Sequence, residues 1–422
     1  MMLPNQSRSK WGALCGCLIA LSSGLAADAW PRFRGPDGNG VAPTIAPSTP
    51  LTWDRETNVT WRSELPGQGW SSPVIGEDQI YLSAAIPFEG GDDFSLALII
   101  MDANSGQTIR VAKLMDQRAE DAPQIHQKNS HASPTPILSG DRVYVHFGHQ
   151  GTACTDRAGN VLWTQRDLAF LPTHGNGGSP VLVDDKLIFT CDGGRRPTVA
   201  ALNTQDGSIA WQVERPVDAA RKFSFCTPTV IEVNRQTQVV APGSDCVLGL
   251  DPDSGRIVWQ VNYDGYSVVP KPVFANGRVY VATGFNRASL LAIRPDGTGD
   301  VTDTHVEWST KKSIPKTPSI VATGDLLLLV SDDGIASCLE QATGEEVWKE
   351  RLGGGFSSSP TLIGDRLYLT AESGKTVVVR AARQFEKLAE NDLGERTLAS
   401  MAVAGSAIYL RTADALYRLE AK

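Results

Sequence analysis

A pattern of apolar and turn residues recurs along the chain and predicts short β-strands joined by tight turns. Each copy opens with a small residue and a proline, passes through a turn, and ends in an apolar-tyrosine-apolar strand. Side chains that alternate in this way point to the two faces of a strand. The copies are Ser72-Pro73 to Tyr81, Thr135-Pro136 to Tyr144, Ser179-Pro180 to Ile188, Thr227-Pro228, Lys271-Pro272 to Tyr280, Thr317-Pro318, Ser359-Pro360 to Tyr368, and Ser400-Met401 to Tyr409.

A second pattern closes most copies with a polar turn, a glycine and a tryptophan. The glycine lies four positions after a polar residue, as in Asp251 and Gly255, where it can take the positive φ of a tight hairpin. The tryptophan that follows is expected to bury its ring against the next repeat. The expected blade-closing tryptophans are Trp61, Trp163, Trp211, Trp259, Trp308 and Trp348.

The spacing of the copies predicts the fold. The eight anchors, at 73, 136, 180, 228, 272, 318, 360 and 401, are 41 to 63 residues apart, and two insertions near 87–93 and 115–130 explain the longest interval. A period of about 40 to 50 residues with four short strands is a propeller blade, which buries its faces only by stacking in a ring. We therefore predict an all-β protein, an eight-bladed β-propeller of four-stranded antiparallel blades.

The last copy, residues 399–422, has room for three strands only. Residues 58–65, which include Trp61, have the character of the missing strand and precede the first copy. We expect this N-terminal strand to complete the last blade and close the ring, because an open edge would otherwise remain. The predicted organisation is a signal peptide at 1–29, an N-terminal segment at 30–66 with the ring-closing strand, and the propeller at 67–422.

Residues 1–29 have the features of a secretory signal. Arg8 and Lys10 precede a short apolar stretch at 11–25, and Ala27-Asp28-Ala29 offers a cleavage site. We therefore expect an exported protein of the periplasm or cell envelope, with no membrane span in the mature chain. Lipidation at Cys15 and an uncleaved N-terminal anchor are the alternatives.

Net charge limits the classes of binding partner, and cysteine content limits the expected disulfides. Without residues 1–29 the chain has 37 basic and 46 acidic residues, a net charge of −9. An acidic chain without a basic stripe argues against nucleic acid and anionic membrane surfaces. The five remaining cysteines (Cys154, Cys191, Cys226, Cys246, Cys338) do not form a disulfide framework. We expect buried free thiols in a monomer, with a Cys226–Cys246 disulfide as the alternative.

The closing pattern, as in the segment from Gly249 to Trp259, resembles the PQQ-like (pyrrolo-quinoline quinone) β-propeller repeat over roughly residues 53–422. The stretch from Trp30 to Val41 is similar to the N-terminal signature of exported bacterial members. One branch of this family comprises quinoprotein dehydrogenases that use PQQ and Ca²⁺. Another is the cofactor-free barrel-assembly scaffold BamB.

The resemblance implies a scaffold or binding propeller of the cell envelope, without catalysis or cofactor, that resembles outer-membrane assembly propellers. Its partner would be an envelope protein, a peptide or a polysaccharide. A PQQ- and Ca²⁺-dependent oxidoreductase is the alternative, and a sugar- or polymer-directed enzyme is a third. The chain departs from the dehydrogenases because its mature part lacks adjacent cysteines and a clear Glu/Asn/Asp set for the ion.

Polar residues gather in loops expected at the mouth of the central channel, over the second to fourth blades. We predict a ligand-binding site there, with no assigned catalytic or metal-binding residue. The candidates are His126, Lys128, His131, His149, His174, Asp192, Arg195 and Lys222. Acid–base catalysis by His131 or His174 with Asp192, a metal site, and ordinary loop histidines are the alternatives. No His-x-x-x-His or Cys-x-x-Cys spacing supports the metal.

Overall fold

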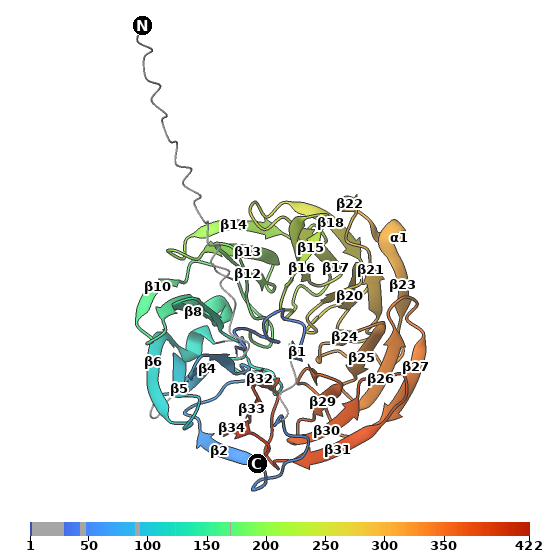
Figure 1. Cartoon of the computed structure of the whole chain (residues 1–422). Coiled ribbons are helices and arrows are strands. Elements are labelled where there is room, and N and C mark those ends of the chain that lie inside the picture. The colour runs from blue at the N-terminus through green and yellow to red at the C-terminus, as the bar shows by residue number, and fades with distance from the viewer. Residues whose placement is uncertain (2–28, 43–47, 89–92, 123, 169) are drawn as a thin grey trace.

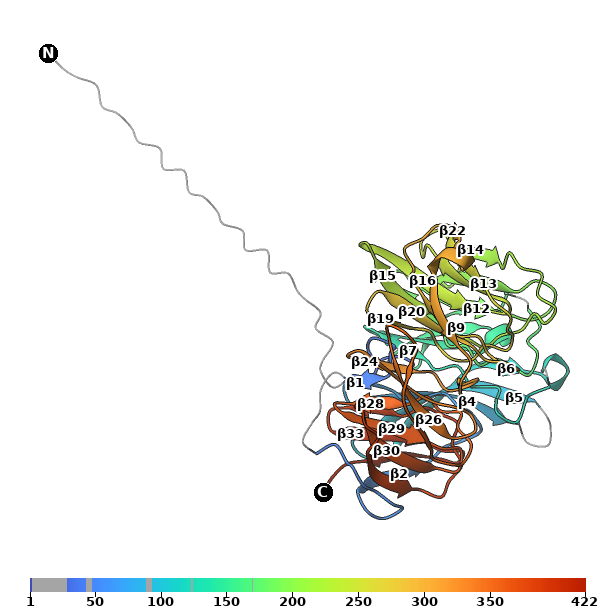
Figure 2. The ribbon, with the colours of Figure 1, turned by 90° about the vertical axis from the view of Figure 1, so that its right-hand side faces the viewer.

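The strands form eight sheets arranged as blades around a channel, which confirms the predicted all-β, eight-bladed propeller (Figure 1). The structure is a computed structural model that describes residue 1 and residues 29–42, 48–88, 93–122, 124–168 and 170–422. Nearly all of the expected signal peptide, including Cys15, lies outside the described residues. Seen from the side in Figure 2, the ring is a thick disc with the strand hairpins stacked around it.

Each blade is an antiparallel sheet of four strands that run from the channel outward. In chain order, and from the innermost strand outward, the first four blades are β3 (Val74–Gly76), β4 (Gln79–Pro87), β5 (Phe94–Asp102) and β6 (Thr108–Gln117); β7 (Ile137–Ser139), β8 (Arg142–His146), β9 (Thr152–Asp156) and β10 (Val161–Gln165); β11 (Val181–Val183), β12 (Lys186–Cys191), β13 (Thr198–Asn203) and β14 (Ile209–Glu214); and β15 (Thr229–Val233), β16 (Gln236–Pro242), β17 (Cys246–Leu250) and β18 (Ile257–Asn262).

The remaining four blades follow the same scheme. They are β19 (Val273–Ala275), β20 (Arg278–Ala282), β21 (Leu290–Ile293) and β23 (Val306–Thr310); β24 (Val321–Thr323), β25 (Leu326–Val330), β26 (Ile335–Glu340) and β27 (Glu346–Arg351); β28 (Thr361–Ile363), β29 (Arg366–Thr370), β30 (Lys375–Arg380) and β31 (Lys387–Asp392); and β32 (Ala402–Ala404), β33 (Ala407–Arg411), β34 (Ala415–Leu419) and β2 (Val59–Glu64).

Two short strands and three short helices complete the described residues. They are β1 (Val41–Ala42), which pairs in parallel with β28, β22 (Gly299–Asp300), which pairs in parallel with β18, η1 (Ala119–Asp121), η2 (Gly148–Gln150) and α1 (Thr302–His305). None of the described helices has the length and hydropathy needed to cross a bilayer.

The N-terminal strand β2 closes the ring, as the sequence predicts. It pairs antiparallel with β34, with Arg62 opposite Tyr417 and Glu64 opposite Ala415. Figure 1 shows blue β2 beside red β34 next to the C-terminus. The two ends of the propeller chain therefore hold each other through a hydrogen-bonded ladder, and the last blade has its full four strands.

Burial follows the position of a strand within its blade. Every residue of β25 is buried, whereas β27, the outermost strand of the same blade, has no fully buried residue. The inner strands face a neighbouring blade on both sides, so both of their faces are apolar. The outer strands face solvent on one side and keep the alternation that defines them in the sequence.

Neighbouring blades meet where an outer-strand tryptophan packs on the glycine turn of the next blade. Trp211 donates its indole N–H to the carbonyl of Pro252 at 2.8 Å. Gly255 of that turn has a φ of 73°, and a Cβ there would lie 2.7 Å from the Trp211 ring. Equivalent bonds run from Trp61 to Ala103, Trp163 to Thr204, Trp308 to Gln341 and Trp348 to Ala382. Trp259 differs, because its indole N–H bonds Gln238 of its own blade.

The described cysteines, Cys154, Cys191, Cys226, Cys246 and Cys338, are all buried and free. The alternative of a Cys226–Cys246 disulfide is therefore not formed. Burial raises the pKa of the Cys154 thiol to about 11, so this group stays protonated and behaves as a small apolar side chain.

Residues 30–42, which we call the N-terminal plug, lie in the channel against the innermost strands of several blades. Trp30 and Ile75 of β3 exchange two backbone hydrogen bonds, of 2.8 and 3.0 Å. The N–H of Leu138 bonds the carbonyl of Pro31, and the plug ends in β1 against β28. In Figure 1, β1 lies near the centre of the ring. The plug therefore links the first two blades to the seventh across the channel.

Candidate functional site

The channel opens at one end into a cup of about 520 Å³. Its wall consists of the loops that lead into the innermost strands, together with two loops between middle strands that carry Phe285 and Asp332. Phe33 of the N-terminal plug also lines the cup, so the plug forms part of its base. A pocket of this size and position is typical of small-molecule and peptide sites.

A ring of hydroxyl groups forms the floor of the cup. Five of these groups belong to residues that immediately precede an anchor of the repeat, and the sixth belongs to Ser319, which follows the anchor Pro318. Each accepts a backbone N–H from the blade before it at 2.9 or 3.0 Å. The bonds run from Ser72 to Thr135, Thr135 to Ser179, Ser179 to Thr227, Lys271 to Ser319, Ser319 to Ser359, and Ser359 to Ser400. Lys271 stands where the other blades have serine or threonine. The repeat thus places one polar group per blade at the same depth.

One side of the wall is a continuous arc of aromatic rings. The ring centroids lie 5.6 Å apart between His126 and His174, 5.6 Å between His174 and Phe223, 5.7 Å between Phe223 and Tyr266, and 5.9 Å between Tyr266 and Phe285. All four contacts are edge-to-face, the favourable geometry for aromatic pairs. We call these five residues the aromatic arc.

His174 holds its place in the arc with an unfavourable backbone conformation. Its φ is 68°, in the left-handed region that costs a residue with a Cβ free energy. Its carbonyl oxygen accepts hydrogen bonds from the His126 N–H at 3.3 Å and from Asn129 Nδ2 at 2.9 Å. These bonds keep the ring beside Phe223 at the rim.

Two cations lie over the arc. The Arg221 guanidinium is 4.7 Å from the centroid of Tyr266, and the Lys316 ammonium is 5.3 Å from that of Phe285. Neither forms an ion pair with a carboxylate in the described part of the chain. Cations over rings are held by the quadrupole of the aromatic system, which leaves their charge open to a ligand.

Two carboxylates of the cup, Asp332 and Glu372, are already engaged by protein donors. Asp332 accepts the backbone N–H of Lys316 at 2.7 Å, and the N–H and hydroxyl of Thr317 at 3.2 and 2.7 Å. Lys128 pairs with Glu372 at 2.8 Å and lies 4.0 Å from Asp332. Asp332 and Glu372 are therefore held by protein donors, whereas the exposed carboxylate of Asp333, which also lines the cup, has no ion pair within the described residues.

Of the eight candidate residues, His126, Lys128 and His174 line the cup. His131 lies behind it, where Nδ1 is 2.7 Å from Gln117 Nε2 and the ring packs on Phe94. His149 is held by Asn176 at 3.0 Å. Burial lowers the pKa of both His131 and His149, so their rings stay neutral around pH 7.

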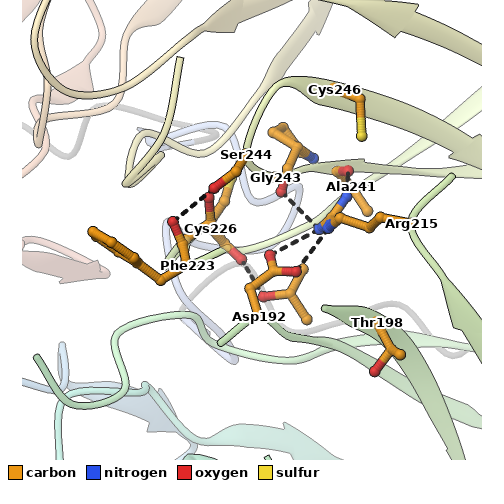
Figure 3. Close-up of polar contacts among 12 residues, drawn as sticks. Asp192, Thr198, Arg215, Phe223, Cys226, Ala241, Gly243, Ser244 and Cys246 are labelled. Atoms are coloured by element: carbon orange, nitrogen blue, oxygen red, sulfur yellow. Dashed lines mark hydrogen bonds and ion pairs between the residues drawn. The ribbon is translucent and has the colours of Figure 1, made fainter. Parts of the chain in front are cut away.

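Asp192 is a buried structural group rather than part of the cup lining. Its carboxylate accepts two hydrogen bonds from Arg215, at 2.7 and 2.9 Å, and Arg215 also donates to the carbonyls of Ala241 and Pro242 in the next blade (Figure 3). Burial raises the pKa of Asp192, and the charge of Arg215 opposes that rise. Since Asp192 lies away from His131 and His174 in this network, it is not placed for acid–base work with them.

The last two candidates, Arg195 and Lys222, lie in exposed or half-buried loops outside the cup lining. Lys222 pairs with Asp218 at 2.7 Å and reaches the carbonyl of Arg195 at 3.3 Å.

The sequence reasoning missed most of the aromatic arc, the cations over it and Phe33. Phe223 and Phe225 stand four and two residues before Thr227, and Tyr266 stands five before Lys271. Positions just ahead of a blade's anchor lead into the innermost strand, so every aromatic residue there was a candidate for the mouth. The repeat pattern contained this signal, but the predicted site comprised only histidines and charged residues.

The Asp332 carboxylate is not available to a calcium ion. Ca²⁺ takes six to eight oxygen ligands, whereas the oxygens of Asp332 are occupied by protein donors beside the Lys128 ammonium. In the described ranges, no three His, Cys, Asp or Glu side chains converge as a metal-binding group.

Comparison with known proteins gives a family and a fold. The family profile described as outer membrane protein assembly factor BamB matches residues 46–169, 128–350 and 300–422, together most of the chain. A search of curated proteins finds no match.

Solved structures with the same fold come from two kinds of protein. BamB from Moraxella catarrhalis has a TM-score of 0.57 at 14% identity over 86% of this chain and 99% of its own. A europium-containing methanol dehydrogenase has a TM-score of 0.61 at 11% identity over 91% and 89%. A quinohemoprotein alcohol dehydrogenase from Pseudomonas putida HK5 has a TM-score of 0.63 at 10% identity over 94% and 80%. At these identities the likeness establishes the fold alone.

Proposed function

Because the chain belongs to the outer membrane protein assembly factor BamB family, we propose that it is an exported, non-catalytic binding propeller of the cell envelope. In this proposal the cup holds a segment of a partner protein. The expected export signal at 1–29 supports the location, and the acidic mature chain supports a protein partner over nucleic acid.

The observation that carries the proposal is the aromatic arc with Arg221 and Lys316 above it. Aromatic residues and arginine are enriched among the residues that contribute most to protein binding. Among the described residues the two cations have no carboxylate ion-pair partner, so an acidic side chain or a chain-terminal carboxylate of a partner would neutralise their charge.

The wall of the cup is held rigidly, which supports a role in binding. His174 is pinned by two hydrogen bonds to its carbonyl, and the floor is tied blade to blade by the ring of hydroxyls. A preorganised site loses little conformational entropy when a segment binds. Phe33 at the base makes the cup blind, so a partner segment would end in it rather than pass through.

The proposal is tested by photo-cross-linking in the native cells. A photoreactive residue at Phe285, which is 51% exposed at the rim, should give covalent adducts with a protein partner. The same residue at Ile109, 55% exposed on the outer strand β6, is the matched control and should give none. When Phe223→Ala is combined with the photoreactive residue at position 285, the adducts should disappear while the amount of protein stays unchanged. Equal adducts from both positions, or adducts that survive Phe223→Ala, would refute a role for the cup.

The export part of the proposal has its own readout. Amino-terminal sequencing of the protein from the envelope fraction should begin at or near Trp30. Trp30 N–H donates to the carbonyl of Ile75 at 2.8 Å, a bond that a new terminal ammonium can also make. A protein that keeps residues 1–29, or that stays in the cytoplasmic fraction, would contradict it.

A further inference from the structure

Below the cup, three cationic side chains gather around the N-terminal plug in the channel. They are Arg32 and Arg34 of the plug and Lys271 of the fifth blade. Asp37 is the acidic group that acts on Arg32, yet it lies beyond ion-pair distance, and none of the three cations has an ion pair within the described residues. Buried charges in proteins are normally paired, so this cluster calls for a source of negative charge.

Arg34 is satisfied largely by backbone carbonyl oxygens. It is 2% exposed and donates to Asn39 and Ile320, both at 2.6 Å, and to Pro360 at 3.5 Å. These bonds orient its guanidinium toward the sixth and seventh blades. Arg34 therefore clamps the plug and contributes positive potential to its surroundings, although its Nε is buried without a partner in the described residues.

Arg32 and Lys271 differ from Arg34 because both line a small hollow, and each has a donor that is not used. The Arg32 guanidinium makes no hydrogen bond in the described chain, and its Nε is buried without a partner. Lys271 is 5% exposed and donates to the Gly38 carbonyl at 3.0 Å and to Thr229 Oγ1 at 3.1 Å. The protonated ammonium has three donors, so in that state one N–H of Lys271 is left over.

The two side chains line one small hollow. It has a volume of about 30 Å³ and is bordered by Phe33, Asp37, Thr227 and Val230 besides the two cations. That space accommodates one particle of the size of water or a monatomic anion. We propose that a small inorganic anion of chloride size binds in this hollow between Arg32 and Lys271, and that it fastens the N-terminal plug in the channel.

The charges at the hollow favour an anion over a water molecule, because the cations Arg32 and Lys271 outnumber the single carboxylate of Asp37. Burial and the neighbouring charges of Arg34 and Arg32 lower the pKa of Lys271 to about 7. A water molecule would satisfy the spare N–H groups and leave the repulsion among the cations in place. An anion satisfies the same donors and offsets that repulsion, since Coulomb interactions are strong in a poorly solvated channel.

Lys271 of this site stands at a repeat position where the other blades have serine or threonine. Seven of the eight residues that immediately precede an anchor of the repeat are serine or threonine, and Lys271 alone carries a charge. Its long side chain leaves the ring of hydroxyls and reaches the plug at Gly38. The replacement therefore couples one blade directly to the segment that closes the channel.

The test is thermal unfolding of the full-length mature protein in chloride against gluconate at equal ionic strength. Gluconate is too large for the hollow, and equal ionic strength cancels general screening. Chloride should raise Tm saturably, by on the order of 2 °C or more at saturation. The variant Arg32→Gln, which breaks no hydrogen bond in the structure, should lose the chloride effect, and the exposed Arg196→Gln should keep it.

A crystal grown in bromide provides a second, independent readout. An anomalous peak within hydrogen-bond distance of Lys271 Nζ is the expected result. Identical Tm values in chloride and gluconate, an unchanged chloride effect in Arg32→Gln, or no bromide peak at the hollow would each overturn the proposal. The variant Lys271→Met is not needed for the decision, because it also removes two hydrogen bonds that hold the plug.

Discussion

Arg215 meets both carboxylate oxygens of Asp192 at 2.7 and 2.9 Å, with the two side chains only 0% and 1% exposed. The pair joins the third blade to the fourth, because Arg215 also bonds the carbonyl of Ala241 at 2.9 Å. Close by, Ser244 of the fourth blade donates to the carbonyl of Phe223 at 2.9 Å, so this region also supports the aromatic arc (Figure 3).

Removal of one partner of this ion pair should be strongly destabilising. Asp192→Ala leaves the Arg215 charge buried and uncompensated, which costs roughly 3–5 kcal/mol of unfolding free energy. The measurement is denaturant unfolding of the purified protein. Arg196→Ala is the control, since its ion pair with Glu214 is 80% and 60% exposed and contributes within about 0.5 kcal/mol. Equal stability losses in the two variants would contradict the role of the buried pair.

A glycine turn that packs against the tryptophan of the preceding blade should not tolerate a Cβ. Gly255→Ala combines a positive φ with a Cβ placed 2.7 Å from the Trp211 ring. Gly277→Ala has nearly the same φ, 74°, and no atom within 4 Å of its Cβ. We expect Gly277→Ala to cost about 1 kcal/mol and Gly255→Ala to cost about 1–3 kcal/mol more. Similar Tm losses in both variants would mean that glycine is required at position 255 for its positive φ and not for the contact with the neighbouring blade.

His146 should make the fold sensitive to acid. Burial lowers its pKa to about 3, against about 6.5 in an unfolded chain. Between these values the unfolded chain binds a proton that the folded chain does not, so stability falls as pH falls from 6.5 toward 3, by about 1.4 kcal/mol per unit. His146→Gln, which can still bond Thr152, should flatten the pH dependence of unfolding free energy. His126→Gln, at the exposed rim, should leave the slope as in the wild type.

Titration with PQQ and Ca²⁺ distinguishes the proposed binding propeller from the alternative of a quinone-dependent oxidoreductase. We expect no calorimetric heat at micromolar quinone and no rise in Tm, because the Asp332 carboxylate is occupied by Lys316 and Thr317. Tight one-to-one binding with a raised Tm would overturn the binding-propeller proposal and direct the search to alcohol and sugar substrates. Addition of a chelator should likewise leave the Tm of the purified protein unchanged.

The sequence predicted the architecture because the repeat encodes it directly. The proline anchors gave the blade number, and the lone strand around Trp61 gave the ring closure that β2 and β34 form. Both follow from local patterns of turn and apolar residues, which survive in any context that stacks the blades.

The site was harder to predict because it depends on which loops converge in space. His131 and His149 stand in the same stretch of sequence as His126 and His174, yet their rings turn behind the wall to bond Gln117 and Asn176. Loop conformations of this kind are set by tertiary contacts and not by periodicity. The plug was likewise unpredictable, because its partners, from Ile75 to Leu362, are spread over nearly the whole chain.

The plug has a consequence for the order in which the molecule is assembled. Residues 30–42 and β2 leave the ribosome before any blade, but β1 pairs with β28 and β2 pairs with β34, which are synthesised last. Contacts between such distant segments form slowly, because the intervening loop must close first. An incomplete chain cannot seat either segment and exposes their unpaired backbone to proteases and chaperones. Residues 30–42 and β2 therefore reach their final positions only after the last blades have been synthesised.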